Sequence, residues 1–288
     1  MSYRKVKRLL YAEKVDMGGF PVRQPFPTNE VDMIDPFLLL HHAETKYSAD
    51  RNPKTMGVGP HPHRGFSPVT FVFKGGVHHQ DSRGNNSVIY EGGTQWMNAG
   101  MGIIHSERPP ENIAEIGGRQ EIIQLWVNTP AEHKMDEPAY FGLTKEETPT
   151  ILQTDIEEIY LVCGVTKDIT GPISSHTEIL AFRCNFKKAG KYLFEIPETH
   201  NAYLYSLDGK LKLSGYGLID GLHLAQFESG EGNIEVEALE NTRFILMSGV
   251  PLNEPVQSQG PFVMNNQTEI MEAMRDYQMG KMGFLVEE

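Results

Sequence analysis

Cysteine is scarce in this sequence, and its two cysteines are far apart. Cys163 lies in the run EIYLVCGV and Cys184 in ILAFRCNF, and each run has the composition of a β-strand. A disulfide-rich scaffold is therefore excluded. The sequence has no CxxC pair, so neither thiol has the spacing of a zinc or redox site. We interpret both as small buried side chains of a protein kept in a reducing compartment.

Positively charged residues are also fewer than negatively charged ones. The chain has 26 Lys and Arg against 38 Asp and Glu, which gives a formal net charge of -12 at pH 7. This balance excludes a nucleic acid or an anionic membrane as the main partner, because both select for clustered Lys and Arg. The basic run from Arg4 to Arg8 is short, and we interpret it as a solvated strand or arm.

Long apolar stretches are missing as well. No stretch approaches the roughly 18 apolar residues of a membrane span. The N-terminus lacks the uninterrupted apolar core of a signal peptide. These absences predict a soluble, cytoplasmic protein.

What the sequence has instead is a series of short β-rich runs. In the first half these are VTFVF, VHHQDS, SVIY and TQWM, each followed by a turn marked by glycine. In the second half they are IYLVCGV, EILAFRCNF, KYLFEI, NAYLYSL, KLKLSGY, NIEVEAL and TRFILMSGV. Short strands at spacings of about 8 to 12 residues are typical of a sandwich or barrel rather than of βαβ units. The sequence therefore predicts an all-β fold in which one architecture is used twice.

A charged segment at residues 132–150 breaks this rhythm, and we interpret it as the connection between the halves. The predicted domains are residues 1–138 and 139–288. One helix is expected at the end of the chain, at about residues 267–279. Its signals are Asn266 as the N-cap, Glu269 three residues later, and Gly280 as the stop.

Two pairs of metal-binding residue types stand out in the first half. His61 and His63 are two residues apart, so a strand would turn both imidazoles to one face. By chance alone a chain with this many histidines holds about 0.4 HxH pairs, so this pair is weak evidence on its own. His105 and Glu107 repeat the spacing on a second strand. If the two strands are neighbours, three imidazoles and one carboxylate meet at one point, which predicts a mononuclear metal site.

These ligands narrow the chemistry without selecting one ion. Three nitrogens and one oxygen suit Fe(II), Mn(II), Ni(II), Cu(II) or Zn(II). An octahedral metal held by four protein groups keeps two positions free for a substrate or for dioxygen, whereas a closed structural zinc site keeps none. We expect an open site.

A third group of polar residues lies between these two pairs. His78, His79 and Asp81 are ligand types, but adjacent histidines on a strand face opposite ways, so only one of the two can point inward. We interpret this group as structural or as part of the pocket rim.

Three further residues are candidates for a substrate pocket. His42 follows an apolar strand, while Gln95 and Trp96 alternate along a strand close to the predicted metal site. A histidine at a strand end and a core tryptophan are the plain alternatives for His42 and Trp96.

The stretches HPHRGFSPVTFVFKGGVHHQDSRGN and GGTQWMNAGMGIIHSERP resemble the N-terminal signature of the pirin family, a branch of the cupin superfamily. The closing segment GPFVMNNQTEIMEAMRDYQMGKMGF resembles the end of the same family. The resemblance implies a bicupin, two antiparallel β-barrels in tandem, with a metal, usually iron, in the first barrel only. It also implies that His61, His63, His105 and Glu107 are the ligands.

Two positions depart from the pattern. Ser67 stands where cupins generally have a Glu, so the carboxylate must come from Glu107, and Glu91 replaces the usual proline of the second motif. The second half has a lone His200 and no HxH pair, which is consistent with a barrel without metal.

Two functions follow from the resemblance. The first is a dioxygenase that cleaves flavonols such as quercetin with O2, in which Glu107 also accepts the substrate's hydroxyl proton. The alternative is a regulatory protein whose metal controls binding to a protein partner. An open apolar cavity would favour the enzyme, and a closed or tiny one the regulator. Two joined barrels already cover each other's faces, so a monomer is the simplest expectation.

Overall fold

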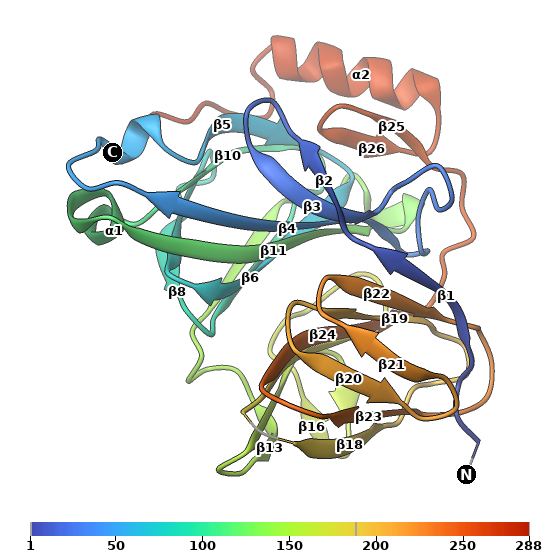
Figure 1. Ribbon diagram of the computed structural model, residues 1–288. Helices are drawn as coiled ribbons and strands as arrows, with labels where there is room; N and C mark the ends of the chain where they lie inside the picture. The colour runs from blue at the N-terminus through green and yellow to red at the C-terminus, as the bar shows by residue number, and fades with distance from the viewer. Residues whose placement is uncertain (1, 188, 288) are drawn as a thin grey trace. The chain divides into compact units, whose positions relative to one another are not determined.

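The computed structural model describes residues 2–187 and 189–287, and most of its secondary structure is β-strand (Figure 1). The chain forms two compact units. We call residues 40–147 with 253–288 the histidine unit, and residues 1–39 with 148–252 the apolar unit. This division differs from the predicted 1–138 and 139–288, because each unit takes a terminal segment from the opposite end of the chain.

The histidine unit contains two larger β-sheets and one two-stranded sheet. Of the two larger sheets, one has the strand order β5-β10-β7-β8, and the other contains the run β12-β9-β6-β11-β4. The boundary between the units falls inside β4. The bounds are β4 Phe37–Tyr47, β5 Val58–His63, β6 Phe66–Lys74, β7 Gly76–Asp81, β8 Asn86–Tyr90, β9 Thr94–Asn98, β10 Ile103–Arg108, β11 Gly118–Asn128 and β12 Ala139–Leu143. Short helices occur at η1 Pro53–Thr55, α1 Glu111–Ile116 and η2 Ala131–His133.

Strand β12 corrects the interpretation of residues 132–150 as a connection alone. It pairs antiparallel with β9, Tyr140 opposite Met97 and Gly142 opposite Gln95. The charged residues around β12 have the composition of a loop, so the local sequence does not indicate a strand. Its pairing partner, β9, lies about 45 residues earlier in the chain. This part of the chain is therefore a component of the histidine unit.

The end of the chain also belongs to the histidine unit. The hairpin β25 (Gln257–Gln259) and β26 (Phe262–Met264) leads into helix α2 (Gln267–Gln278), which lies beside it in Figure 1. The side chain of Asn266 accepts a hydrogen bond from the Glu269 N–H, as the predicted cap requires. Ile270 and Ala273 of the helix pack in one apolar cluster with Ile104 of β10 and with residues of β26.

The apolar unit repeats the two-sheet plan with a different interior. Its sheets have the orders β1-β22-β19-β24-β17-β14-β13 and β18-β23-β20-β21, and β2-β3 and β15-β16 are hairpins. One cluster of alkyl and aromatic side chains fills the space inside, including Phe182, Phe194 and Phe244. The bounds are β1 Val6–Tyr11, β2 Glu13–Asp16, β3 Pro21–Phe26, β13 Thr150–Gln153, β14 Glu157–Cys163, β15 Val165–Thr166, β16 Ile169–Thr170, β17 Ile179–Phe186, β18 Gly190–Phe194, β19 Asn201–Ser206, β20 Lys210–Leu213, β21 Gly217–Asp220, β22 His223–Phe227, β23 Ile234–Ala238 and β24 Thr242–Gly249.

Both cysteines lie in strands of the apolar unit, in β14 and β17. Cys163 and Cys184 are buried free thiols, and burial raises the pKa of the Cys163 thiol to about 12. Their interpretation as buried side chains is confirmed. Within the described ranges, no helix has the length and apolar character needed to cross a membrane.

Candidate metal centre

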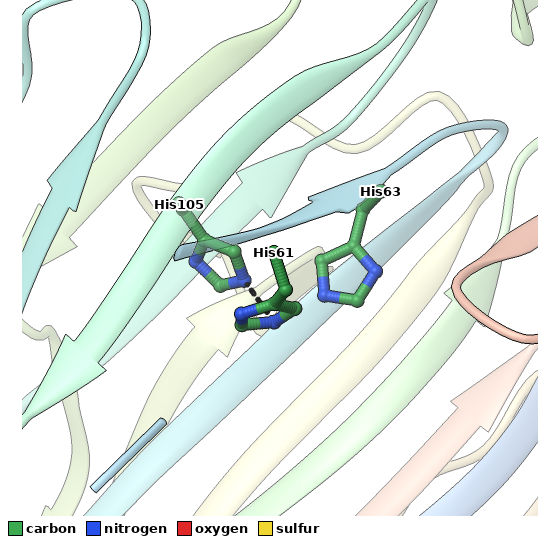
Figure 2. A group of neighbouring side chains, drawn as sticks. All are labelled: His61, His63 and His105. Atoms are coloured by element: carbon green, nitrogen blue, oxygen red, sulfur yellow. Dashed lines mark hydrogen bonds between the residues drawn. The ribbon is translucent and has the colours of Figure 1, made fainter. Parts of the chain in front are cut away.

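Neighbouring strands bring the three predicted histidines together. Strand β5 pairs antiparallel with β10, with His61 opposite His105 and His63 opposite Ile103. Since residues two apart in a strand share a face, His61, His63 and His105 project to the same side of the sheet. Figure 2 shows the three imidazole rings grouped, with one nitrogen of His105 facing a nitrogen of His61. The adjacency of the two strands is the arrangement that the repeated spacing predicts.

The distances between these rings fit one bound cation. One nitrogen of each imidazole lies within 4.8 Å of the others, and Nε2 of His105 is 3.0 Å from Nε2 of His61. Two nitrogens bound at right angles to a metal, each at about 2.1 Å, would be about 3.0 Å apart. The three imidazole nitrogens therefore have the spacing expected of ligands to one metal ion.

Backbone carbonyls orient two of the rings. Nδ1 of His61 lies 2.8 Å from the carbonyl oxygen of Gly59, and Nδ1 of His63 lies 3.3 Å from that of Pro261. An imidazole that donates its Nδ1–H to a carbonyl keeps its lone pair on Nε2. Both rings are thus set to offer Nε2 as the ligand atom.

Burial favours the neutral form that a metal ligand requires. His63 and His105 are 3% and 2% exposed. Burial, and then the neighbouring His61, lower the pKa of His63 well below its ordinary value. The same causes lower the pKa of His105, to which His63 and His79 also contribute. Both imidazoles are neutral at pH 7, with a lone pair available.

Glu107 stands beside this cluster rather than in it. Among the described residues, the set of ligand atoms within 4.8 Å of one another contains the three histidines without Glu107. The register of β10 with β5 shifts between His105 and Glu107, but the extra residue lies in β5. Strand β10 pairs with β7 over the same two residues without a shift, so both side chains keep one face. The expected inward direction is kept, because Glu107 and His105 line one cavity of about 10 Å³.

Three side chains fix the Glu107 carboxylate. Its Oε1 accepts from Thr70 Oγ1 at 3.0 Å and from Gln95 Nε2 at 2.8 Å, and its Oε2 accepts from Gln124 Nε2 at 2.7 Å. Thr70 and Gln124 lie on β6 and β11 and were not singled out in the sequence. Thr70 lies opposite Gln124 in the pairing of β6 with β11, so the two side chains point to the same face of their sheet.

The three residues expected in a substrate pocket have different surroundings. Gln95 contacts Glu107 directly. Trp96 is fully buried, and its Nε1 donates to Asn98 Oδ1 at 3.1 Å, which agrees with its interpretation as a core tryptophan. The next residue along a strand faces the opposite way, which turns Trp96 into the core when Gln95 faces the site. His42 is buried and lies 3.2 Å from the Glu121 carboxylate.

The group at His78, His79 and Asp81 divides as the alternation of a strand requires. His79 is 1% exposed, and its Nε2 lies 2.9 Å from Asp81 Oδ2. His78 is half-buried and hydrogen-bonds to Asn86 at 2.7 Å. Burial alone raises the pKa of the Asp81 carboxyl, but hydrogen bonds from His79, Arg83 and Asn85 outweigh it, so this pKa lies below its ordinary value.

Comparisons with known proteins agree with this architecture. The family model described as Pirin matches residues 19–127, and the Pirin C-terminal cupin domain matches residues 181–283. A Pseudomonas aeruginosa protein provisionally named quercetin 2,3-dioxygenase is 37% identical over 268 residues, covering 91% of this chain and 92% of its own. The Pirin-like protein of Solanum lycopersicum is 34% identical, covering 97% of this chain and 92% of its own.

A solved structure matches over nearly the whole length. The crystal structure of quercetin 2,3-dioxygenase from Acinetobacter baumannii has a TM-score of 0.91 and 32% sequence identity, and it covers 99% of this chain and 100% of its own. Both halves of the sequence are therefore accounted for by one family, and the resemblance of the sequence motifs is confirmed. The chain belongs to the pirin family of bicupin proteins.

Proposed function

We propose that this chain is a metal-dependent dioxygenase that cleaves flavonol-type substrates with O2, as a quercetin 2,3-dioxygenase does. The observation that carries the proposal is the convergence of His61, His63 and His105 on one point. The similarity to the Acinetobacter baumannii quercetin 2,3-dioxygenase over 99% of the chain supports the choice of reaction. A flavonol and one O2 would yield the ring-opened ester and carbon monoxide.

In this proposal the three histidines and Glu107 hold one divalent transition metal. Iron is the first choice, and Mn, Ni, Cu and Zn fit the same donors. The ion would supply a Lewis acid for the substrate's oxygen atoms and redox chemistry with O2. His61 and His63 keep Nε2 available through their hydrogen bonds to backbone carbonyls.

Glu107 has a second proposed role, as the base that accepts the substrate's hydroxyl proton. Its carboxylate is held by Thr70, Gln95 and Gln124, so it needs little reorganisation to receive a proton. It borders the same small cavity as His105, which keeps the base beside the metal ligands.

Oxygen uptake tests this function. Metal-free protein is loaded separately with Fe(II), Mn(II), Ni(II) and Cu(II) and mixed with quercetin. We expect uptake with at least one ion, with one carbon monoxide released per O2 consumed. No uptake with any ion that binds would overturn the enzymatic proposal.

A substitution tests the role of the carboxylate. Glu107→Gln keeps a ligand oxygen but loses the base, so turnover should fall by about 10² to 10⁴ while the metal content falls far less. Glu158→Gln is the matched control, since Glu158 is a buried carboxylate of the apolar unit. Full activity in Glu107→Gln would show that this residue is not the base.

One observation favours a second candidate, a regulatory protein whose metal controls binding to a protein partner. The cavity lined by His105 and Glu107 is about 10 Å³, about the space that one water molecule needs. Pockets for small organic ligands are typically about 300 Å³ or larger. Metal binding at one ion per chain without oxygen uptake would support this candidate over the enzyme.

A further inference from the structure

A chain of hydrogen-bonding side chains runs from Asp81 through His79 to His105. Strands β7 and β10 pair antiparallel, with Asp81 opposite His105 and His79 opposite Glu107. His79 is 1% exposed and Asp81 is 4% exposed, so water does not compete for these contacts. Of the three clustered histidines, His105 is the one whose Nδ1 faces a side chain rather than a backbone carbonyl.

The Asp81 end of this chain has a fixed polarity. Oδ1 of Asp81 accepts from the backbone N–H groups of Arg83 and Asn85, at 2.9 and 3.1 Å. Oδ2 faces the Asn85 side-chain nitrogen at 2.8 Å and His79 Nε2 at 2.9 Å. An ionised carboxylate only accepts hydrogen bonds, so His79 must carry its proton on Nε2. The Nδ1 of a neutral His79 is then left as an acceptor.

This acceptor decides where His105 carries its proton. His79 Nδ1 lies 3.4 Å from His105 Nδ1, so His105 donates through an Nδ1–H and keeps its lone pair on Nε2. That Nε2 is the atom 3.0 Å from His61 Nε2. We propose that Asp81 and His79 are positioning residues that set the tautomer of His105 and present its Nε2 to the metal. The inference rests on the metal centre proposed above and not on its reaction.

Tyr140 fixes the plane of the intermediate ring. Its ring stacks on His79 at a centroid distance of 4.0 Å and an interplanar angle of 10°. Its hydroxyl donates to Gln95 Oε1 at 3.2 Å, and Gln95 donates to Glu107. Tyr140 therefore contacts both His79, the partner of His105, and Gln95, the partner of Glu107.

The substitution Asp81→Asn reverses the polarity of the chain. The two backbone N–H groups at Oδ1 cannot turn, so they retain the amide oxygen, and the new NH2 group must face His79. His79 then accepts at Nε2 and carries its proton on Nδ1. It would donate to His105 Nδ1, which moves the proton of His105 to Nε2, the ligand atom.

Co(II) binding measures the consequence. We expect Asp81→Asn to weaken Co(II) binding by about 10- to 100-fold, the usual cost of losing a partner behind a ligand. His79→Phe retains a ring against Tyr140 without an acceptor and should give a loss of the same size. His78→Phe is the matched control, because His78 faces away from the cluster, and it should bind as the unsubstituted protein does.

A second measurement needs neither a variant nor a metal. Nitrogen-15 NMR of the metal-free protein should show His105 as the Nδ1–H tautomer and His79 as the Nε2–H tautomer. His105 carrying its proton on Nε2 would overturn the inference, as would unchanged Co(II) affinity in both Asp81→Asn and His79→Phe. Failure of the unsubstituted protein to bind metal would overturn the metal centre and this inference together. Loss of oxygen uptake alone, with Co(II) binding as expected, would overturn only the proposed reaction.

Discussion

The two units share a plan of paired sheets but differ in what their inner strands carry. In the apolar unit, β23 is the second strand of its four-stranded sheet, and it buries Ile234, Val236 and Ala238. In the histidine unit, β10 holds the same place in its sheet and buries His105. The same strand order is compatible with apolar or with polar inward side chains. The strand order alone therefore does not determine whether a unit has a binding site. The chemistry depends on which inward positions are polar.

The two interiors also differ in the free energy of burying their side chains. Burying an imidazole or a carboxylate is unfavourable unless its polar atoms are paired. In the histidine unit the partners are backbone carbonyls for His61 and His63 and side chains for His105 and Glu107. The core cluster of the apolar unit consists of apolar side chains, which need no polar partners. We infer that the apolar unit contributes stability and the histidine unit contributes chemistry.

The strongest test of this comparison removes one buried histidine from each unit. His63→Ala should weaken metal binding by more than about 100-fold, because losing a ligand costs more than losing a partner behind it. His200→Ala removes a residue that hydrogen-bonds to Ser248 at 3.0 Å in the apolar unit, so it should leave metal content unchanged and lower stability. Metal content by elemental analysis and urea unfolding measure the two effects. Equal metal content in both variants would contradict the division of roles.

A smaller effect is expected from the core of the apolar unit. Phe244 is fully buried, with its ring 5.4 Å from Phe186 and 6.3 Å from Phe194. Phe244→Ala should lower the free energy of unfolding by about 3 to 5 kcal/mol. Tyr216→Ala, at a position 47% exposed, is the control and should change it by less than about 0.5 kcal/mol. If Phe244→Ala also alters metal affinity, the units are not independent in function.

The features that sequence predicts well in this molecule depend on local alternation. The strands that carry the histidines, the shared face of His61 and His63, and the opposite faces of His78 and His79 all follow from the period of two along a strand. The N-cap of α2 follows from two residues within one turn, Asn266 and Glu269. Each of these needs no knowledge of distant parts of the chain.

The features that sequence does not predict depend on long-range pairing. Tyr140 stacks on His79 from β12, a strand whose charged neighbours have the composition of a loop. Thr70 and Gln124 hydrogen-bond to Glu107 from another sheet, and no local pattern in the sequence shows this contact. Helical spacing alone does not show which apolar side chains of α2 are buried. Met274 and Tyr277 are 37% and 40% exposed, whereas Ile270 is 0% exposed. The helix buries Ile270 and Ala273 because β26 and β10 contact it on that face.

The smallest predicted effect concerns a buried charge of the histidine unit. Lys134 is 1% exposed, and its Nζ donates to the carbonyl oxygens of Gly65 and Val263 and to Asn128 Oδ1. Burial lowers the pKa of the Lys134 ammonium to about 8, although Glu254 and Glu269 act in the opposite direction. Its ordinary value, 10.5, applies to the unfolded chain.

The sign of the pH dependence follows from these two values. Between about pH 8 and 10.5 the folded chain has lost the Lys134 proton and the unfolded chain still holds it, so stability rises with pH. The free energy of unfolding, measured relative to Lys134→Met, should therefore rise by up to about 3 kcal/mol across this window and stay constant below it. Lys14→Met removes an exposed lysine and should show no such rise. If the free energy of unfolding relative to Lys134→Met does not change with pH, the three acceptors of Lys134 offset the free-energy cost of burying its charge. Burial of this charge would then be no less favourable than burial of an apolar side chain.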